Sequence, residues 1–425
     1  MELSKQLNQT NLERINKNIY ANTYDLITLK NRYSKLVTEH NRLFNIPAEK
    51  LFSTSGRTEL GGNHTDHNLG IVVAGTINLD TIAAVHRTNN NIVIINSEGY
   101  PSVTVDISDT SIQANEQGTT NALVRGIASI FKANNVKVSG FSANTSSNVL
   151  KGSGLSSSAA IEVLIATIFN NLFNNDAFSP LFLAQIGQES ENKYFGKPCG
   201  LMDQVACANG GIVTIDFEDK NNPKVLPIDF SFNDYGYNLI IVDTGGNHAD
   251  LTDDYASIPS EMKSVANFFG KKVLREVDEQ EFYNSIPEIR KKLNNDRMVL
   301  RAIHFFNENK RCIKMKEALE KKDFKDYLAN VKLSGHSSFD YLQNLYSPKN
   351  PKEQGLSLAI ALTENFCNEK EAFRVQGGGF AGTIQAYIEN PRAKEYIKQM
   401  EKVFSVGCCI PISIRAEKSA CLLSV

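Results

Sequence analysis

The chain contains the stretch Lys151-Gly152-Ser153-Gly154-Leu155-Ser156-Ser157-Ser158-Ala159-Ala160, which leads into an apolar run with helical spacing from Ile161 to Leu172. Its glycines leave backbone amides free to close on an anion, and the positive end of the following helix is expected to face the same point. It is not a Walker P-loop, because no Gly-Lys-Ser/Thr follows the first glycine at the required spacing. A serine-rich loop that only caps a helix is the alternative, but three serines joined to an Ala-Ala helix start favour a phosphate site.

Composition limits the classes of protein to consider. A chain of 425 residues is longer than a single domain with one hydrophobic core usually is, so we expect two domains. Lys plus Arg number 45 against 47 for Asp plus Glu, a balance that argues against nucleic-acid binding through net charge. No apolar run approaches the roughly 20 residues that span a bilayer, so we expect no membrane contact and a small-molecule partner.

Cysteine usage and the N-terminus bear on location. Residues 1–10 are polar, so no secretory signal is expected. The seven cysteines are scattered, mostly among apolar neighbours and without metal-ligand spacing. Buried free thiols in a reducing cytoplasm are the interpretation that fits them.

Hydrophobic periodicity predicts a mixture of helices and strands. An amphipathic helix is expected over 25–44 and a strand-rich region over 51–105. Further helices are predicted over 121–133, 156–172, 180–194, 297–308, 311–321 and 354–368, and further strands over 210–215, 237–243, 372–389 and 408–416. Strict βαβ alternation is lacking, so we expect an α+β fold of two domains, residues 1–210 and 211–425, with the active site in the cleft between them.

A second motif, Gly56-Arg57-Thr58-Glu59-Leu60-Gly61-Gly62-Asn63-His64-Thr65-Asp66-His67-Asn68-Leu69-Gly70, gathers an Arg, an amide, two imidazoles and carboxylates among glycines. Such density in a loop favours recognition of hydroxyls, since carboxylates accept hydrogen bonds while Asn and His both donate and accept. A metal site from His64, Asp66 and His67 is the competing interpretation, but their spacing matches no helix-face ligand set. A polyol is the better fit.

Two further segments complete the pattern. Residues 191–204, Glu-Asn-Lys-Tyr-Phe-Gly-Lys-Pro-Cys-Gly-Leu-Met-Asp-Gln, hold two carboxylates in different surroundings, Glu191 and Asp203. One could hold Mg²⁺ and the other a proton. Residues 376–383, Gln-Gly-Gly-Gly-Phe-Ala-Gly-Thr, would let another backbone approach closely.

In this order the four segments resemble the galactokinase branch of the GHMP small-molecule kinases, from about Leu51 to the C-terminus. The matching family patterns are G-R-x-N-x-x-G-E-H-x-D-Y-x-x-G, G-x-G-L-S-S-S-A-A, C-G-x-M-D-Q and the late glycine motif. The resemblance implies ATP-dependent phosphorylation of a sugar at its anomeric hydroxyl, with ATP and Mg²⁺ required. The sugar and ATP would be the partners of a chain that we expect to be a monomer.

The resemblance also implies roles for individual residues. Asp203 takes the catalytic carboxylate position and Arg57 its charged neighbour, with the choice between base and electrostatic stabiliser left open. Ser158 and Glu191 match the Mg²⁺ positions. The remaining implied contacts are to ATP phosphates from Gly152, Ser153, Gly154, Leu155, Ser156, Ser157 and Ser158, and to the sugar from Asn63, His64, Asp66, Gly200, Asp203 and Tyr255.

Three departures from the sugar signature bear on the substrate. Asn63 replaces the family's Glu, His67 replaces Tyr, and Glu59 stands where Asn is usual. Galactose is the expected sugar, and galacturonate or another aldose is the alternative, because losing a carboxylate at position 63 suits a sugar acid. On this view Asn63→Glu would leave galactose use intact. A non-catalytic galactose sensor is the third hypothesis, although Ser158-Ala159, Asp203 and Arg57 all favour catalysis.

Overall fold

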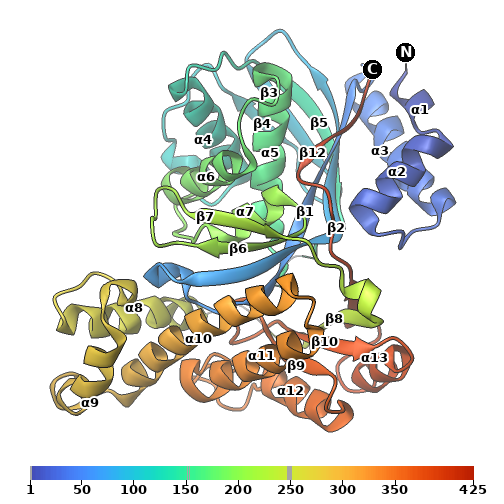
Figure 1. Ribbon diagram of the computed structural model, residues 1–425. Helices are drawn as coiled ribbons and strands as arrows, with labels where there is room; N and C mark the ends of the chain where they lie inside the picture. Colours follow the sequence, from blue (N-terminus) through green and yellow to red (C-terminus); the bar gives the residue numbers. More distant parts are fainter. Residues whose placement is uncertain (1, 151, 153, 247–250) are drawn as a thin grey trace.

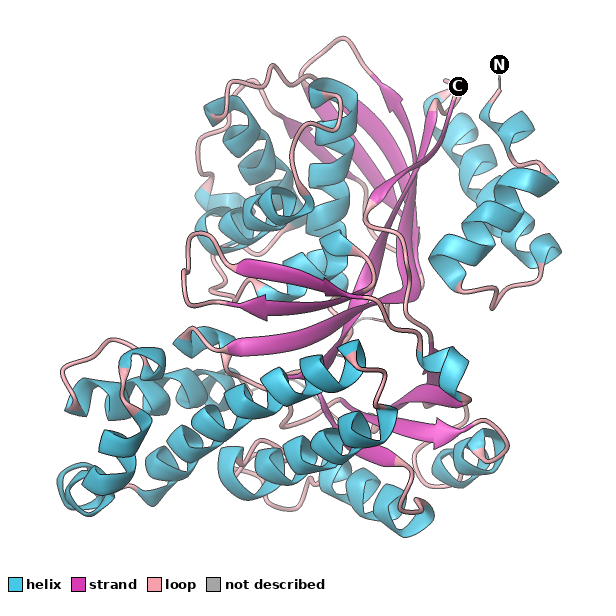
Figure 2. Ribbon diagram, viewed as in Figure 1, coloured by secondary structure: helices cyan, strands magenta, loops and turns pink. Residues whose placement is uncertain are grey.

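The structure is a computed structural model that describes residues 2–150, 152, 154–246 and 251–425. The described residues form two β-sheets with helices packed around them (Figures 1 and 2). This confirms the expected α+β class. Within these ranges, none of the helices combines the length and the apolar character that a membrane crossing requires.

The first sheet comes mainly from the N-terminal half of the chain and has eight strands. Its main path runs β12-β1-β2-β5-β3-β4, and the hairpin of β6 and β7 joins β2. The pairing of β3 with β5 is parallel, and the others are antiparallel. The strands are β1 (Lys50–Gly61), β2 (Ile71–Arg87), β3 (Ile92–Ser97), β4 (Val103–Asp106), β5 (Phe141–Ser147), β6 (Ile212–Asp216), β7 (Lys224–Ile228) and β12 (Ala420–Ser424).

Both faces of this sheet are covered by helices. Successive side chains of a strand point to opposite faces, so Phe52 and Ala83 pack into one apolar cluster while Leu51 and Ile82 pack into another. The first cluster lies under α4 (Thr120–Ala133), α5 (Ser157–Asn174) and α6 (Pro180–Ser190), and α7 (Met202–Asn209) packs nearby against β1 and β2. This double burial explains why the strands are apolar without clean alternation.

The opposite face is closed by three N-terminal helices, α1 (Leu3–Gln6), α2 (Gln9–Tyr20) and α3 (Leu26–Phe44). The predicted helix over 25–44 is confirmed as α3, and the two shorter helices were not foreseen. Asp80 on β2 anchors them, because its carboxylate accepts Arg32 Nη1 at 2.7 Å and Tyr20 Oη at 2.8 Å. The helices before Leu51 therefore complete the core of the sheet.

The second sheet has the order β11-β8-β10-β9. Its strands are β8 (Tyr237–Asp243), β9 (Ala372–Gln376), β10 (Thr383–Glu389) and β11 (Cys409–Ile412). The surrounding helices are α8 (Thr252–Phe268), α9 (Glu279–Leu293), α10 (Asp296–Glu320), α11 (Phe324–Ser337), α12 (Gly355–Phe366) and α13 (Ala393–Glu401). The two helices predicted over 297–321 are one continuous helix, because no Gly or Pro interrupts them.

The end of β1 reaches the second sheet, which places the sugar signature at the junction of the sheets. Gln385 Nε2 donates to the carbonyl of Glu59 at 2.6 Å, and Thr58 Oγ1 donates to Gln376 Oε1 at 3.1 Å. Leu60 shares an apolar cluster with Leu239 of β8. These contacts hold the two halves of the molecule against one another.

Residues 212–228 extend the first sheet, although the sequence analysis assigned them to the second domain. β6 pairs with β2 over Ile212–Asp216, and β12 returns the chain end to β1. Sheet pairing is a long-range property that a local change of composition does not report. We propose that the first domain comprises residues 1–228 together with 420–424.

Candidate active site

The phosphate loop connects β5 to the start of α5. Gly152, Gly154 and Ser156 have φ of 77°, 65° and 61°, the left-handed region in which glycine carries no penalty. Leu155 is fully buried and fixes the loop in the apolar core. Ser153 lies outside the described residues. The loop thus ends at the N-terminus of an 18-residue helix, whose dipole favours anions.

Arg57 and Asp203 meet beside this loop. Arg57 Nε on β1 donates to Asp203 Oδ1, at the start of α7, at 2.8 Å. Ser156 Oγ donates to Asp203 Oδ2 at 2.5 Å. Arg57 Nη1 also donates to the carbonyl of Gly154. Residues from three distant segments therefore form one hydrogen-bonded unit.

This unit keeps Asp203 charged. Burial alone would raise the pKa of Asp203, but the Arg57 charge and the hydrogen bonds from Arg57 and Ser156 outweigh it and lower the pKa below its usual range. The side chain of Asp203 is 34% exposed and that of Arg57 only 6%. Asp203 is therefore ionised at neutral pH with one side open to the cavity.

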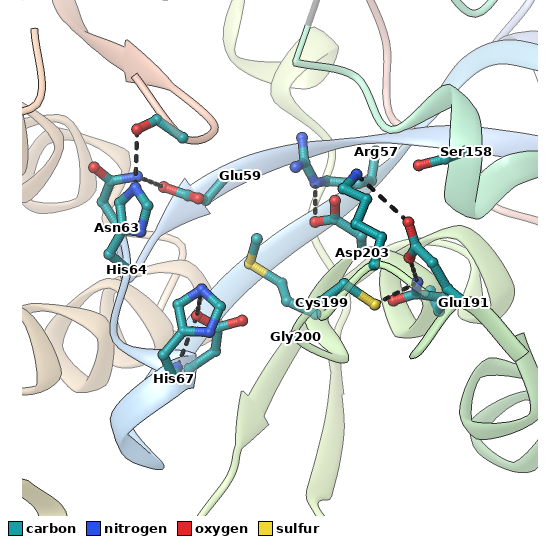
Figure 3. A pocket seen from close by; sticks show the side chains of 15 residues that line it. Arg57, Glu59, Asn63, His64, His67, Ser158, Glu191, Cys199, Gly200 and Asp203 are labelled. Atoms are coloured by element: carbon teal, nitrogen blue, oxygen red, sulfur yellow. Dashed lines mark hydrogen bonds and ion pairs between the residues drawn. The ribbon is translucent and has the colours of Figure 1, made fainter. Parts of the chain in front are cut away.

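Glu191 lies at the end of α6, where the chain continues as a π-helical turn, η3 (Glu191–Phe195). Its Oε1 is 3.5 Å from Lys197 Nζ, and its Oε2 accepts Gln204 Nε2 at 3.1 Å. Ser158, in the first turn of α5, lines the same cavity as Glu191 (Figure 3). The sequence placed the two at a common site, and the structure brings both to this cavity.

The donors at this end suit a hard divalent cation. A carboxylate and a hydroxyl offer oxygen ligands, which Mg²⁺ prefers. The described residues contain no group of three or more His, Cys, Asp or Glu side chains that could hold a metal. An ion here would therefore complete its shell with water and phosphate oxygens, as Mg²⁺ commonly does.

Glu162 is a buried carboxyl that sequence reasoning missed. Gln204 Nε2 donates to its Oε2 at 2.9 Å and so bridges Glu162 and Glu191. Burial, together with the charge of Glu191, raises the pKa of Glu162 well above its usual range. The available signal was a single carboxyl in the otherwise apolar helical run after the phosphate loop.

The other end of the cavity is formed by the sugar signature. His64 has φ of 58°, and its Nε2 donates to the carbonyl of Gly378 at 2.8 Å. Burial and the neighbouring His67 lower the pKa of His64 to about 4, so its imidazole is neutral. A side chain at position 200 would lie 2.1 Å from Asp66 Oδ2, so Gly200 is required for the approach of this carboxylate.

Asn63 is fully buried, and its side-chain amide forms hydrogen bonds to other residues of the protein. Its Nδ2 donates to Glu59 Oε1 at 2.9 Å and to the carbonyl of Gly377 at 2.7 Å. Its Oδ1 accepts Asn344 Nδ2 at 2.8 Å. Glu59 in turn accepts Arg374 Nη2 at 2.6 Å. Burial raises the pKa of Glu59 to about 7 against the opposing charges of Arg374 and Arg57.

Tyr255, on α8, contacts the late glycine loop and is not among the residues that line the cavity. Its Oη donates to the carbonyl of Gly379 at 2.9 Å, and its ring lies against Gly378. Burial raises the pKa of Tyr255 to about 12. Gly377 and Gly379 have φ of 68° and 79°, which explains the glycine run of this loop.

One cavity of about 160 Å³ is lined by residues of both ends, namely Arg57, Asn63, His64, Asp66, Ser158, Glu191, Gly200 and Asp203 (Figure 3). Tyr255, Glu162 and the described residues of the phosphate loop other than Ser158 are not among its lining residues. The cavity also has lining residues that the sequence analysis did not select as site residues, namely Glu59, His67, Lys197, Cys199, Met202, Gln204 and Gly378. Every one of them lies inside a quoted motif. The motifs therefore predicted the walls, and the fold decided which side chains face inward.

Two family models built from known proteins match parts of this chain. The model "Galactokinase galactose-binding signature" matches residues 38–87, and "GHMP kinases N terminal domain" matches residues 121–211. A galactokinase of Lacticaseibacillus paracasei is 30% identical over 373 residues, which cover 85% of this chain and 91% of the relative. A galactokinase of Limosilactobacillus reuteri is 28% identical over 387 residues, covering 87% and 93%.

Solved structures show the same fold. The Lactococcus lactis galactokinase complexed with galactose matches with a TM-score of 0.77 and 21% identity, over 91% of this chain and 99% of that one. A mevalonate kinase matches with a TM-score of 0.61 and 16% identity, over 86% and 99%. The order of the motifs, the cavity that they enclose and the match along nearly the whole length of a curated relative lead to one conclusion: this chain belongs to the galactokinase family of GHMP kinases.

Proposed function

We propose that the protein is an ATP-dependent sugar 1-kinase that converts galactose and ATP to galactose 1-phosphate and ADP. The observation that carries this proposal is the ion pair of Arg57 and Asp203, which lies between the phosphate loop and the sugar signature in one cavity. A phosphoryl donor on the loop and a hydroxyl acceptor at the signature would meet at this pair. The kinship with galactokinases supports galactose as the acceptor.

In the transfer, the anomeric oxygen forms a bond to the γ-phosphorus, and the bond from that phosphorus to the β,γ-bridging oxygen breaks. Asp203 either accepts the hydroxyl proton or stabilises the developing charge, and each role requires the ionised carboxylate. The positive charge of Arg57 lowers the pKa of Asp203 and so keeps this carboxylate ionised. The same charge would balance negative charge that develops during the phosphoryl transfer.

The phosphate end would be held by the loop before α5. Backbone amides of residues 152–158 and the helix dipole favour the β- and γ-phosphates. Ser158 and Glu191 would hold Mg²⁺, which neutralises phosphate oxygens when it is bound. Lys197, whose Nζ is 3.5 Å from Glu191, adds a positive charge at the same end.

The sugar end would be held by the signature. Asp66, against Gly200, can accept hydrogen bonds from hydroxyls, and neutral His64 donates to Gly378 and so fixes the adjoining loop. Asn63 and Tyr255 are fixed to the late glycine loop by hydrogen bonds. We propose that Asp66, Gly200 and Asp203 touch the sugar, and that His64, Asn63 and Tyr255 shape its site.

The test is ADP release with a panel of sugars, in the presence of Mg²⁺ and after chelation. We expect galactose to give the highest kcat/KM and chelation to abolish turnover. A higher kcat/KM for galacturonate than for galactose would show that the substrate is galacturonate and not galactose. Tight galactose binding with no ADP release, in the presence of ATP and Mg²⁺, would make the protein a sensor instead.

We further propose that the protein acts as a monomer in the cytoplasm, with the sugar and ATP as its partners. Its seven cysteines, all within the described residues, are free thiols. Unpaired thiols persist in a reducing compartment. Light scattering of the purified protein and fractionation of the source cells would test these two expectations.

A further inference from the structure

Two departures from the sugar signature are reciprocal. Position 59 carries Glu where the pattern has Asn, and position 63 carries Asn where the pattern has Glu. In the structure these two side chains touch, because Asn63 Nδ2 donates to Glu59 Oε1 at 2.9 Å (Figure 3). The carboxylate and the amide have therefore exchanged positions across a single hydrogen bond, and the cavity has kept its carboxylate.

Asn63 has no hydrogen-bonding capacity left for a sugar. A primary amide donates two hydrogen bonds, and both go to protein oxygens, those of Glu59 and Gly377. Its oxygen accepts Asn344 Nδ2 at 2.8 Å and Ser338 Oγ at 3.4 Å. The side chain is completely buried. Asn63 therefore holds Glu59 and the late glycine loop in place by hydrogen bonds.

Glu59 is the opposite case. Its Oε1 accepts both Asn63 Nδ2 and Arg374 Nη2, whereas its Oε2 has no hydrogen-bond partner among the described residues. Glu59 lines the cavity together with Asp66 and Asp203. Because Glu59 lines the cavity and its Oε2 makes no hydrogen bond to the described residues, Oε2 can accept a hydrogen bond from a ligand.

The charges around Glu59 bear on which ligand fits. Arg374 is fully buried, pairs with Glu59 through Nη2 and is not among the residues that line the cavity. His64 is neutral, as its lowered pKa shows. The carboxylates of Glu59, Asp66 and Asp203 line the cavity, and the cations Arg57 and Lys197 pair with acids at the phosphate end. The carboxylate of a sugar acid would therefore meet repulsion from these side chains, with no unpaired cation among the residues that line the sugar end.

We propose that Glu59 is a specificity-determining residue whose Oε2 accepts a hydrogen bond from a hydroxyl of the sugar, while Asn63 and Arg374 hold it in place. The same carboxylate excludes uronic acids, so the exchange at positions 59 and 63 preserves the preference for a neutral sugar. This inference rests on the proposed sugar kinase function.

The first test is Glu59→Gln, assayed at pH 8, where Glu59 with its pKa of about 7 is mostly ionised; the substitution keeps the shape of the side chain and removes the charge. We expect the KM for galactose to rise roughly 10- to 100-fold, because a hydrogen bond to a charged group is lost, with little change in kcat or in the KM for ATP. Discrimination against galacturonate should fall. Across monodeoxygalactoses, the penalty should disappear for the sugar that lacks the bonded hydroxyl.

The matched control is Glu371→Gln. Glu371 is equally buried and paired with an arginine, Arg392, but lies at the far edge of the second sheet, away from the cavity. It reports what the loss of a buried ion pair does to folding alone. Thermal unfolding of both variants separates stability from sugar recognition.

The second test uses the exchange itself. Asn63→Glu alone would set two carboxylates at about the 2.9 Å now spanned by a hydrogen bond, so we expect weak galactose binding and a lower Tm. This reverses the expectation drawn from sequence. The double variant Glu59→Asn/Asn63→Glu restores one carboxylate and one amide, and galactose kcat/KM should recover to within about tenfold of the unmodified protein.

The outcomes separate the two proposals. If the unmodified protein does not phosphorylate galactose, the proposed function fails. If it does, but Glu59→Gln leaves the galactose KM and the galacturonate discrimination unchanged, only the role of Glu59 fails. A double variant no better than Asn63→Glu alone would also overturn the reciprocal exchange, whatever the folding of the single variants.

Discussion

The two ends of the cavity are built in different ways. At the phosphate end, Asp203 is 34% exposed, and its partners are Arg57 on β1 and Ser156 in a loop with left-handed backbone at Gly154 and Ser156. At the sugar end, Asn63 and Arg374 are completely buried and belong to one hydrogen-bond network that spans both sheets.

The two ends therefore place different demands on the sequence. A phosphate loop depends on local backbone geometry, so its sequence pattern is strict. The hydrogen-bond network of Glu59, Asn63 and Arg374 depends on each donor having an acceptor. An amide and a carboxylate can therefore exchange positions if the hydrogen bond between them is preserved. We propose that the first end binds the phosphoryl donor and that the second selects the acceptor.

Asp203→Asn is expected to give the largest effect, a loss of turnover with little change in galactose binding. Removing the charge at the phosphate end should lower kcat by about 10²- to 10⁴-fold, because the group that accepts the proton or stabilises charge is lost. Galactose binding, measured by calorimetry, should change little. A kcat within a few-fold of the unmodified protein would contradict the assigned role of Asp203.

Arg374→Met should act mainly on stability. It leaves Glu59 buried without its cation, and breaking one side of a buried ion pair typically costs about 3–5 kcal/mol. Chemical denaturation would measure this loss. The comparison variant is Arg392→Met, whose arginine is 30% exposed, and its loss should be smaller. If both variants lost the same free energy of unfolding, the ion pair of Arg374 and Glu59 would contribute no more to stability than the partly exposed pair of Arg392 and Glu371.

Ser156→Ala should have a modest effect on turnover. It removes the hydrogen bond from Ser156 Oγ to Asp203 Oδ2 but leaves Arg57 in place. We expect kcat to fall about 2- to 10-fold, in keeping with one hydrogen bond. Steady-state kinetics would measure it, and a loss as large as that of Asp203→Asn would show that Ser156 has a further role.

The smallest effects should come from pH, and they should differ between the two ends. The lowered pKa of Asp203 keeps it ionised, so its protonation should not limit kcat between about pH 6 and 8. Glu59, which faces Arg374, Arg57, Asp66 and Asn63, has a pKa of about 7 and gains charge as the pH rises through this value.

Discrimination of galactose over galacturonate should therefore increase from pH 6 to pH 8 by a few-fold. The ratio of the two kcat/KM values measures this, and Glu59→Gln should flatten it. A ratio that falls with rising pH would contradict the assigned titration.

Much of the site was predictable because its determinants are local. The phosphate loop, the segment with Asp203 and the late glycine loop each follow from short motifs, and Gly200 and Gly377 occupy positions where a side chain would clash or the backbone is left-handed. The helix over 25–44 was predictable for the same reason. The hairpin of β6 and β7 was assigned to the other domain, since pairing with β2 leaves no local signal.

The sequence by itself determined the reaction class and predicted the residues of the proposed phosphate site, because glycine conformation, helix dipoles and motif spacing act over a few residues. Only the tertiary structure decided the meaning of Glu59 and Asn63. Arg374 lies 315 residues from Glu59 along the chain, and the late glycine loop is equally distant. The sequence shows that position 63 lacks a carboxylate, but not that Glu59 places one in the same cavity. That depends on side-chain contacts that exist only after both sheets have packed together.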